Sequence, residues 1–182
     1  GADFDVQEAF MLRFRLTLAF FYGAMLVLPG MGCYSFKGIS IDPRVSTFFV
    51  ANFDNSAPNA PPTLALDFTE RLKDKIRAET RLILKTDDAH VEFQGQMTDY
   101  RVEPIAPRPG QENVALNRLV IKVKVRAVNN VEDDIKWPAE REFQHFAEFS
   151  NDADLTQIQN TLIRQIGEQL LEDAFNYFFN NW

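Results

Sequence analysis

Apolar residues recur at helical spacing in two stretches of the chain. The first stretch begins after Thr63, a residue type suited to an N-cap, and continues to about Thr80. The second follows Asp154, where the sequence resembles a capping box, and runs from Leu155 to about Phe179. Each stretch predicts an amphipathic helix with one buried stripe. The stripes comprise Leu64, Phe68, Leu72 and Ile76 in the first helix, and Leu155, Ile158, Leu162, Ile166, Leu170, Ala174 and Phe178 in the second.

The segments outside these stretches alternate between apolar and polar residues or are rich in β-branched and aromatic ones, which is typical of strands. The segment from Pro104 to Gly110 contains three prolines and predicts a stiff loop that cannot be a strand. We therefore expect an α+β two-layer sandwich, in which two helices pack on one face of an about four-stranded, mostly antiparallel sheet. The predicted strands are residues 44–53, 82–85, 90–103, 117–128 and 137–149.

The N-terminal segment has the pattern of a secretory signal peptide. Two arginines follow Met11, and thirteen uncharged residues, 16–28, come next. This apolar run is too short for a membrane-spanning helix, which needs about 17 to 25 residues. Because Cys33 is the only cysteine and follows a glycine, we expect it to be lipidated; the alternative is a free thiol near a cleavage site. The predicted organisation is an upstream extension (1–10), a lipoprotein signal peptide (11–32) and a single domain (33–182).

Composition narrows the possible functions. The 182 residues include 19 Lys+Arg and 26 Asp+Glu, a formal net charge of −7, which argues against a nucleic-acid partner. A single cysteine excludes a disulfide framework and a Cys-rich zinc site. The two histidines, His90 and His145, lie in separate predicted strands without a nucleophile motif or glycine-rich phosphate loop beside them. We therefore expect no enzymatic activity, no metal site and no cofactor.

Several short pieces of sequence, spread in order along the chain, together span nearly the whole of residues 33–182. They are residues 32–36 (GCYSF) with Gly38, 53–55 (FDN), 68–72 (FTERL), 93–96 (FQGQ) leading to 99–100 (DY), 117–119 (NRL), 175–176 (FN) and 181–182 (NW). No single piece is a specific motif, but the order and spacing of the pieces together form a specific pattern. With these pieces the chain resembles the shorter branch of the LptE family of lipopolysaccharide-assembly lipoproteins.

The resemblance implies a protein that is lipid-anchored on the periplasmic side of the outer membrane. Members of the family bind the β-barrel translocon LptD, plug its lumen, assist its assembly and contact lipopolysaccharide during its insertion into the outer leaflet. The fold known for the family, two helices on a four-stranded sheet, agrees with the predicted order of elements. Two other classes remain open: a free-standing periplasmic ligand-binding lipoprotein, which would need a deep apolar pocket, and an exported hydrolase, which would need a convergent site.

A basic stripe on one face of the predicted strand 117–128 is the sharpest candidate for lipopolysaccharide binding. Its cations could contact the phosphates of lipid A, and arginine offers bidentate contacts. A structural role is equally open, because Glu140, Glu142 and Glu148 would pair with the stripe if the last predicted strand lay beside it. A second candidate is Arg108, in the proline-rich loop, although that loop could be a mere connection. The stripe consists of Arg118, Lys122, Lys124 and Arg126.

Overall fold

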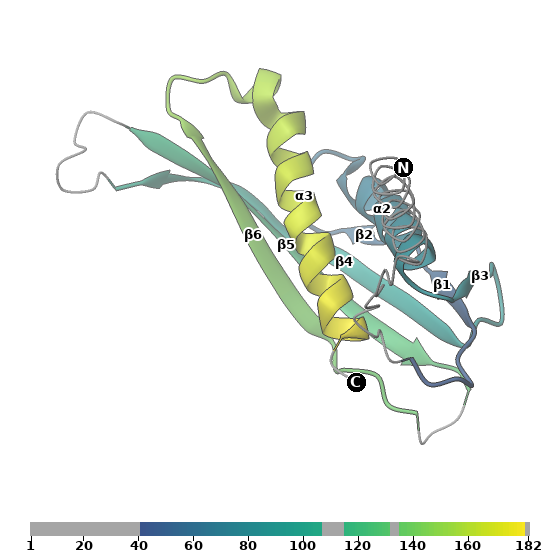
Figure 1. Cartoon of the computed structure of the whole chain (residues 1–182). Coiled ribbons are helices and arrows are strands. Elements are labelled where there is room, and N and C mark those ends of the chain that lie inside the picture. Colours follow the sequence, from purple (N-terminus) through teal and green to yellow (C-terminus); the bar gives the residue numbers. More distant parts are fainter. Residues whose placement is uncertain (1–40, 107–114, 132–134, 181–182) are drawn as a thin grey trace, which may run out of the picture. The chain divides into compact units, whose positions relative to one another are not determined.

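The computed structural model describes residues 41–106, 115–131 and 135–180, which form two helices and six strands (Figure 1). The predicted upstream extension, the signal peptide and Cys33 lie outside these residues. The elements are β1 (Thr47–Val50), β2 (Asp54–Asn55), α2 (Leu64–Glu79), β3 (Ile83–Leu84), β4 (Val91–Ile105), β5 (Leu116–Asn129), β6 (Arg141–Ser150) and α3 (Leu155–Phe179).

The strands form one mixed sheet in the order β3-β1-β4-β5-β6, with β2 also paired to β4. The long strands β4, β5 and β6 are antiparallel neighbours, whereas β1 is parallel to both β3 and β4, and β2 is parallel to β4. The predicted α+β class is thus confirmed, and the long strands are antiparallel as expected, but the sheet has six strands instead of about four and its short strands pair in parallel. The physical reason is the crossover through α2, which returns the chain to the sheet in the direction in which it left.

Two predicted boundaries also need correction. The dipeptide Asp54–Asn55, which lies just beyond the predicted strand 44–53, is strand β2, and β4 continues through Pro104, which lies opposite Asn117. Among the described residues, no strand pairs with the other side of β4 beyond Met97. Proline is tolerated there because an edge strand needs no second row of backbone donors.

Both predicted helices are confirmed, and they pack on the same face of the sheet (Figure 1). The predicted stripe of α2 is buried throughout, while that of α3 is buried from Leu162 onward and only partly buried at Leu155 and Ile158. Asp154 caps α3 by accepting a hydrogen bond from the Thr156 amide at 2.9 Å. Thr63 occupies the N-cap position of α2 but makes no side-chain cap.

Aromatic packing joins the C-terminal half of α3 to the sheet. The Phe93 ring, on β4, lies 5.6 Å between centroids from each of Trp137, Phe178 and Phe179. Phe178 and Phe179 are each only 1% exposed, so they close the sandwich instead of offering a partner-binding surface. Offset and edge-to-face ring pairs of this kind contribute about 0.5–1.5 kcal/mol beyond their buried area.

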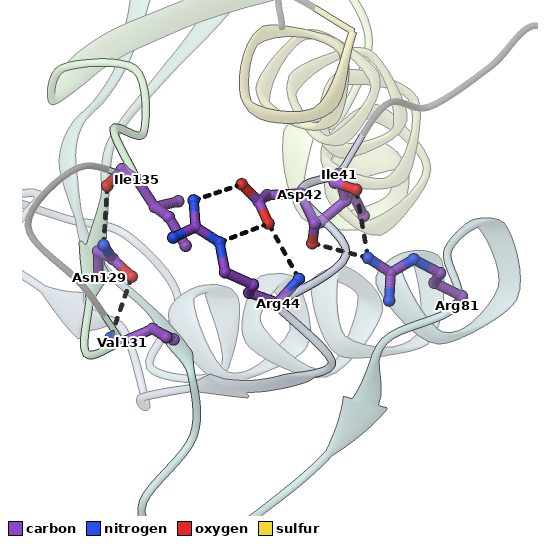
Figure 2. A network of polar contacts seen from close by, with 7 residues as sticks. All are labelled: Ile41, Asp42, Arg44, Arg81, Asn129, Val131 and Ile135. Carbon is purple, nitrogen blue, oxygen red and sulfur yellow. Dashed lines mark hydrogen bonds and ion pairs between the residues drawn. The ribbon is translucent and has the colours of Figure 1, made fainter.

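Polar contacts tie the peripheral segments of the domain together (Figure 2). The Arg81 guanidinium donates to the carbonyls of Ile41 and Asp42, at 3.2 and 2.8 Å. The side-chain hydrogen bond from Arg44 lowers the pKa of Asp42 to about 2. In the connection between β5 and β6, the Asn129 side chain donates to the carbonyl of Ile135 at 2.7 Å and accepts from the Val131 amide. These contacts hold segments that no regular ladder supports.

Two ion pairs, Lys75–Glu172 and Arg71–Glu168, connect α2 to α3. The Lys75 ammonium lies 2.6 Å from carboxylate oxygens of both Glu79 and Glu172, and 4.9 Å from the centroid of the Phe175 ring. Arg71 pairs with Glu168 at 3.2 Å one turn away. The hydrogen bond from Lys75 is the main cause that lowers the pKa of Glu172.

Close packing around Gly95 leads to a first prediction. A Cβ added at Gly95 would lie 2.3 Å from the Lys124 carbonyl oxygen and 2.5 Å from the Phe53 ring. We expect Gly95→Ala to lower the free energy of unfolding by about 1–3 kcal/mol, the usual cost of overpacking, as measured by urea denaturation. Gly167→Ala is the control, because it meets only the flexible end of Arg71, at 3.1 Å, and gains helix propensity. Equal urea midpoints for wild type and Gly95→Ala would contradict the packing described.

The Lys75–Glu172 pair leads to a second prediction. Because the folded-state pKa of Glu172 is lowered, its stabilising contribution is present above its ordinary pKa and is lost as the pH falls. Glu172→Gln should therefore destabilise the protein at pH 7 by less than about 1 kcal/mol, since the Glu172 side chain is 53% exposed and solvent screens the pair. The difference from wild type should vanish by pH 3 in urea titrations. Glu168→Gln, which breaks the longer Arg71 pair, should have a smaller effect at pH 7.

Candidate functional site

The sheet face opposite the helices, here called the outer face, carries the candidate site residues. β5 is its central strand, and its even-numbered residues from Leu116 to Arg126 point outward, because the odd-numbered residues Leu119, Ile121, Val123 and Val125 are buried beneath the helices. The register places outward residues of β4 and β6 directly beside them. The outer face is therefore a grid of cross-strand rows.

The basic stripe is compensated along its β6 side. Arg118 lies 2.7 Å from Glu148, Lys122 lies 3.5 Å from Glu142, and Lys124 lies 3.4 Å from Glu140. The predicted cross-strand pairing is thus confirmed. The three contacts differ in strength, because only the arginine pair has the length of a strong charge-assisted hydrogen bond, and the two lysine pairs are longer.

The β4 side of the stripe adds acidic neighbours that the sequence pattern did not predict. The ladder shifts register between Met97 and Asp99, and beyond this shift Asp99 lies opposite Lys122 and Glu103 lies opposite Arg118. Arg101 forms ion pairs with both of these carboxylates. Strict alternation from Met97, which is buried, would have placed the side chains of Asp99, Arg101 and Glu103 in the core. Charged residues at three alternate positions were the signal that a bulge had to intervene.

Arg126, at one end of the stripe, differs from the other three cations. Its guanidinium donates to the side-chain oxygen of Gln94, at 2.9 Å from Nε, and it has no carboxylate partner among residues 41–106, 115–131 and 135–180. A hollow of about 230 Å³ opens beside it. The hollow is lined by Asp54, Gln94, Gly95, Gln96, Lys124, Arg126 and Glu140. Two cations and two amides thus converge on one concave, solvent-open site.

The remaining site predictions fall elsewhere. Cys33 and Arg108 lie outside the described residues, and their roles stay predictions. His90 accepts a hydrogen bond from the Ser46 amide at 3.1 Å, and His145 lies 2.6 Å from Asp173 of α3. The two histidines are therefore not brought together. Within the described part of the chain, no group of three or more His, Cys, Asp or Glu side chains could hold a metal ion.

A larger hollow, of about 490 Å³, lies between the start of α2 and the first half of α3. Its lining includes four charged side chains, Asp67, Glu70, Arg71 and Arg164. This lining mixes charged and apolar side chains, and so differs from the deep apolar pocket that a free-standing ligand-binding lipoprotein would need. Neither of the two described helices has the length and apolar character required to cross a membrane.

Comparison with known proteins identifies the family. The sequence model of LptE, described as lipopolysaccharide assembly, matches residues 45–178, which include every described strand and nearly all of α3. The chain belongs to the LptE family. This LptE protein is accordingly a lipopolysaccharide-assembly protein, and the resemblance drawn from its short sequence pieces is confirmed. No curated protein matches it significantly.

Several solved structures are similar to this LptE chain at low identity. A minor lipoprotein from Acinetobacter baumannii is 15% identical, with 76% of this chain and 95% of that chain covered, at a TM-score of 0.49. PelC from Paraburkholderia phytofirmans, a dodecamer, is 9% identical over 77% and 93%, at 0.46. Lipoprotein B from Nitrosomonas europaea is 14% identical over 75% and 87%, at 0.41. The assignment to LptE does not depend on these likenesses.

Proposed function

We propose that this LptE protein is an outer-membrane lipoprotein that plugs an LptD-type β-barrel, supports its assembly and assists the insertion of lipopolysaccharide into the outer leaflet. Membership of the family supports this function, and no catalytic role is proposed. In this proposal residues 11–32 are the signal peptide, residues 33–182 are the mature domain, and Cys33 carries the lipid that anchors it on the periplasmic side.

We further propose that lipopolysaccharide phosphates bind at the Lys124–Arg126 end of the basic stripe. The observation that supports this location is the unequal pairing of the four cations. Among the residues that the structure describes, Arg118 already has a short carboxylate contact, whereas Arg126 has only an amide and Lys124 only a long contact to Glu140. An anion can therefore bind here without breaking a strong internal pair.

The geometry of the hollow also suits a phosphorylated sugar. Arg126 and Lys124 supply cationic donors, and the side chains of Gln94 and Gln96 supply neutral donors and acceptors for hydroxyl groups. The acidic Asp54 and Glu140, which also line the hollow, oppose a purely anionic ligand. Contacts that mix phosphate and sugar groups are therefore favoured over binding of a bare polyanion. Lys122 would contribute only after its contact with Glu142 is exchanged for a ligand.

The barrel partnership predicts a specific composition of the native complex. Tagged protein, extracted from outer membranes in mild detergent, should co-purify with one large β-barrel protein in near-equal amount, identified by mass. The matched control is the same chain with Cys33→Ser, in which loss of the anchor should reduce recovery from the membrane fraction. A protein recovered alone would instead favour the free-standing ligand-binding lipoprotein.

The phosphate site predicts a localised loss of affinity. The double variant Lys124→Gln/Arg126→Gln should bind lipopolysaccharide about tenfold more weakly, equivalent to about 1.4 kcal/mol. As the salt concentration rises, lipopolysaccharide binding by the wild type should weaken, and binding by the variant should weaken less. The control is Lys73→Gln/Arg77→Gln on α2, which removes the same charge far from the outer face. Equal losses in both double variants would indicate non-specific attraction and contradict the proposed site.

A further inference from the structure

An apolar pair interrupts the charged grid of the outer face. Val120 of β5 and Phe146 of β6 lie directly opposite each other, although both occupy outward positions. Val120 is only 1% exposed, because its neighbours cover it, whereas 45% of Phe146 is exposed. An exposed phenylalanine on the solvent side of a half-buried sheet has no function in the core of the domain. Its exposed area is therefore available for contact with a partner.

Arg118 holds this aromatic ring in a prepared arrangement. The guanidinium carbon lies 3.9 Å from the centroid of the Phe146 ring, which is a close cation–π contact. The same guanidinium is fixed from its other side by Glu148, at 2.7 Å. The Arg118 side chain, which has many rotamers when it is free, is thus already ordered together with Glu148. This order reduces the conformational entropy that is lost when a partner binds.

The charges around the pair favour a protein as its partner. Three cations, Arg101, Arg118 and Lys122, surround it together with three carboxylates, Asp99, Glu103 and Glu148. Arg101 pairs with Asp99 and Glu103, and Arg118 pairs with Glu148. Because Arg101 and Arg118 are already held by carboxylates, they are less available to an anionic glycolipid than Arg126, whose partner among the described residues is an amide. An aromatic and an arginine inside a rim of both signs is the composition of a protein–protein hot spot.

We infer that Phe146 and Arg118, which lie beside the buried Val120, form an anchor for protein–protein contact with the inner wall of the barrel partner. This inference rests on the proposed function and divides the outer face into two halves. The half around Lys124 and Arg126 contacts lipopolysaccharide, and the half around Phe146 contacts the barrel. The rows of Val120 and Lys124 are about 13 Å apart along β5, so the two contacts can form at the same time.

The test uses the full-length lipoprotein in outer membranes. Phe146→Ser should reduce recovery of the barrel protein about tenfold or more, as expected for a hot-spot aromatic, and should leave lipopolysaccharide affinity within about twofold of wild type. Leu66→Ser is the matched control, because Leu66 is similarly exposed, at 51%, but lies on α2. A photoreactive amino acid placed at position 146 should cross-link to the barrel protein, and one placed at position 66 should not.

The outcomes separate this inference from the proposed function. If wild type recovers the barrel and Phe146→Ser recovers as much, the Phe146 anchor is overturned while the proposed function stands. If position 146 cross-links to lipopolysaccharide and not to protein, the division of the face is wrong. If wild type recovers no barrel at all, the proposed function fails, and the anchor fails with it. Arg118→Gln provides a second, milder variant, which should lower recovery without changing the urea midpoint by more than the loss of one ion pair.

Discussion

Burial of one side of β4 and β5 beneath α3 is the constraint on which the rest of the structure depends. Phe93 meets the rings of Trp137, Phe178 and Phe179 on that side. Because side chains alternate along a strand, every residue that this packing draws inward commits its neighbours to the opposite face. The cations of β5 share the outer face for this reason, since the intervening leucine, isoleucine and valines are buried on the other side.

The energies of the two faces differ in a way that matters for function. Burial of one phenylalanine contributes about 1.5–3 kcal/mol, whereas an exposed ion pair contributes about 0–1 kcal/mol. The helix-facing side therefore determines stability, and the outer-face pairs, at contact lengths such as 3.5 Å for Lys122–Glu142, contribute little to it. Side chains that contribute little to folding can exchange partners, so the outer face is free to bind ligands without loss of the fold.

The sequence predicted those features that depend on a long, regular pattern. Both helices, their buried stripes and the alternation of β5 follow from the periodicity of apolar residues, and the pairing of the stripe with β6 follows from matching alternation. The parallel placement of β1 and β2 did not follow, because a pattern along one strand carries no information about its neighbour. The acidic β4 side of the site was missed because the shift after Met97 reverses the alternation. The prediction that no strand could include Pro104 was wrong because this residue lies at the edge of the sheet. There, the backbone donor that proline lacks is not needed.

A cation with a weak internal partner suits a protein that must pass its ligand onward. Glu140 lies 3.4 Å from Lys124, so in the proposed site an arriving phosphate would compete with this carboxylate and displace it. When the phosphate leaves, the carboxylate returns, and no unpaired charge is exposed in between. The internal partner therefore lowers affinity and eases release. A chain with a net charge of −7 strengthens this effect, because its own field disfavours retention of an anion. Under the proposed function, the acidic residues beside the basic stripe are what make the site a point of transfer instead of a point of storage.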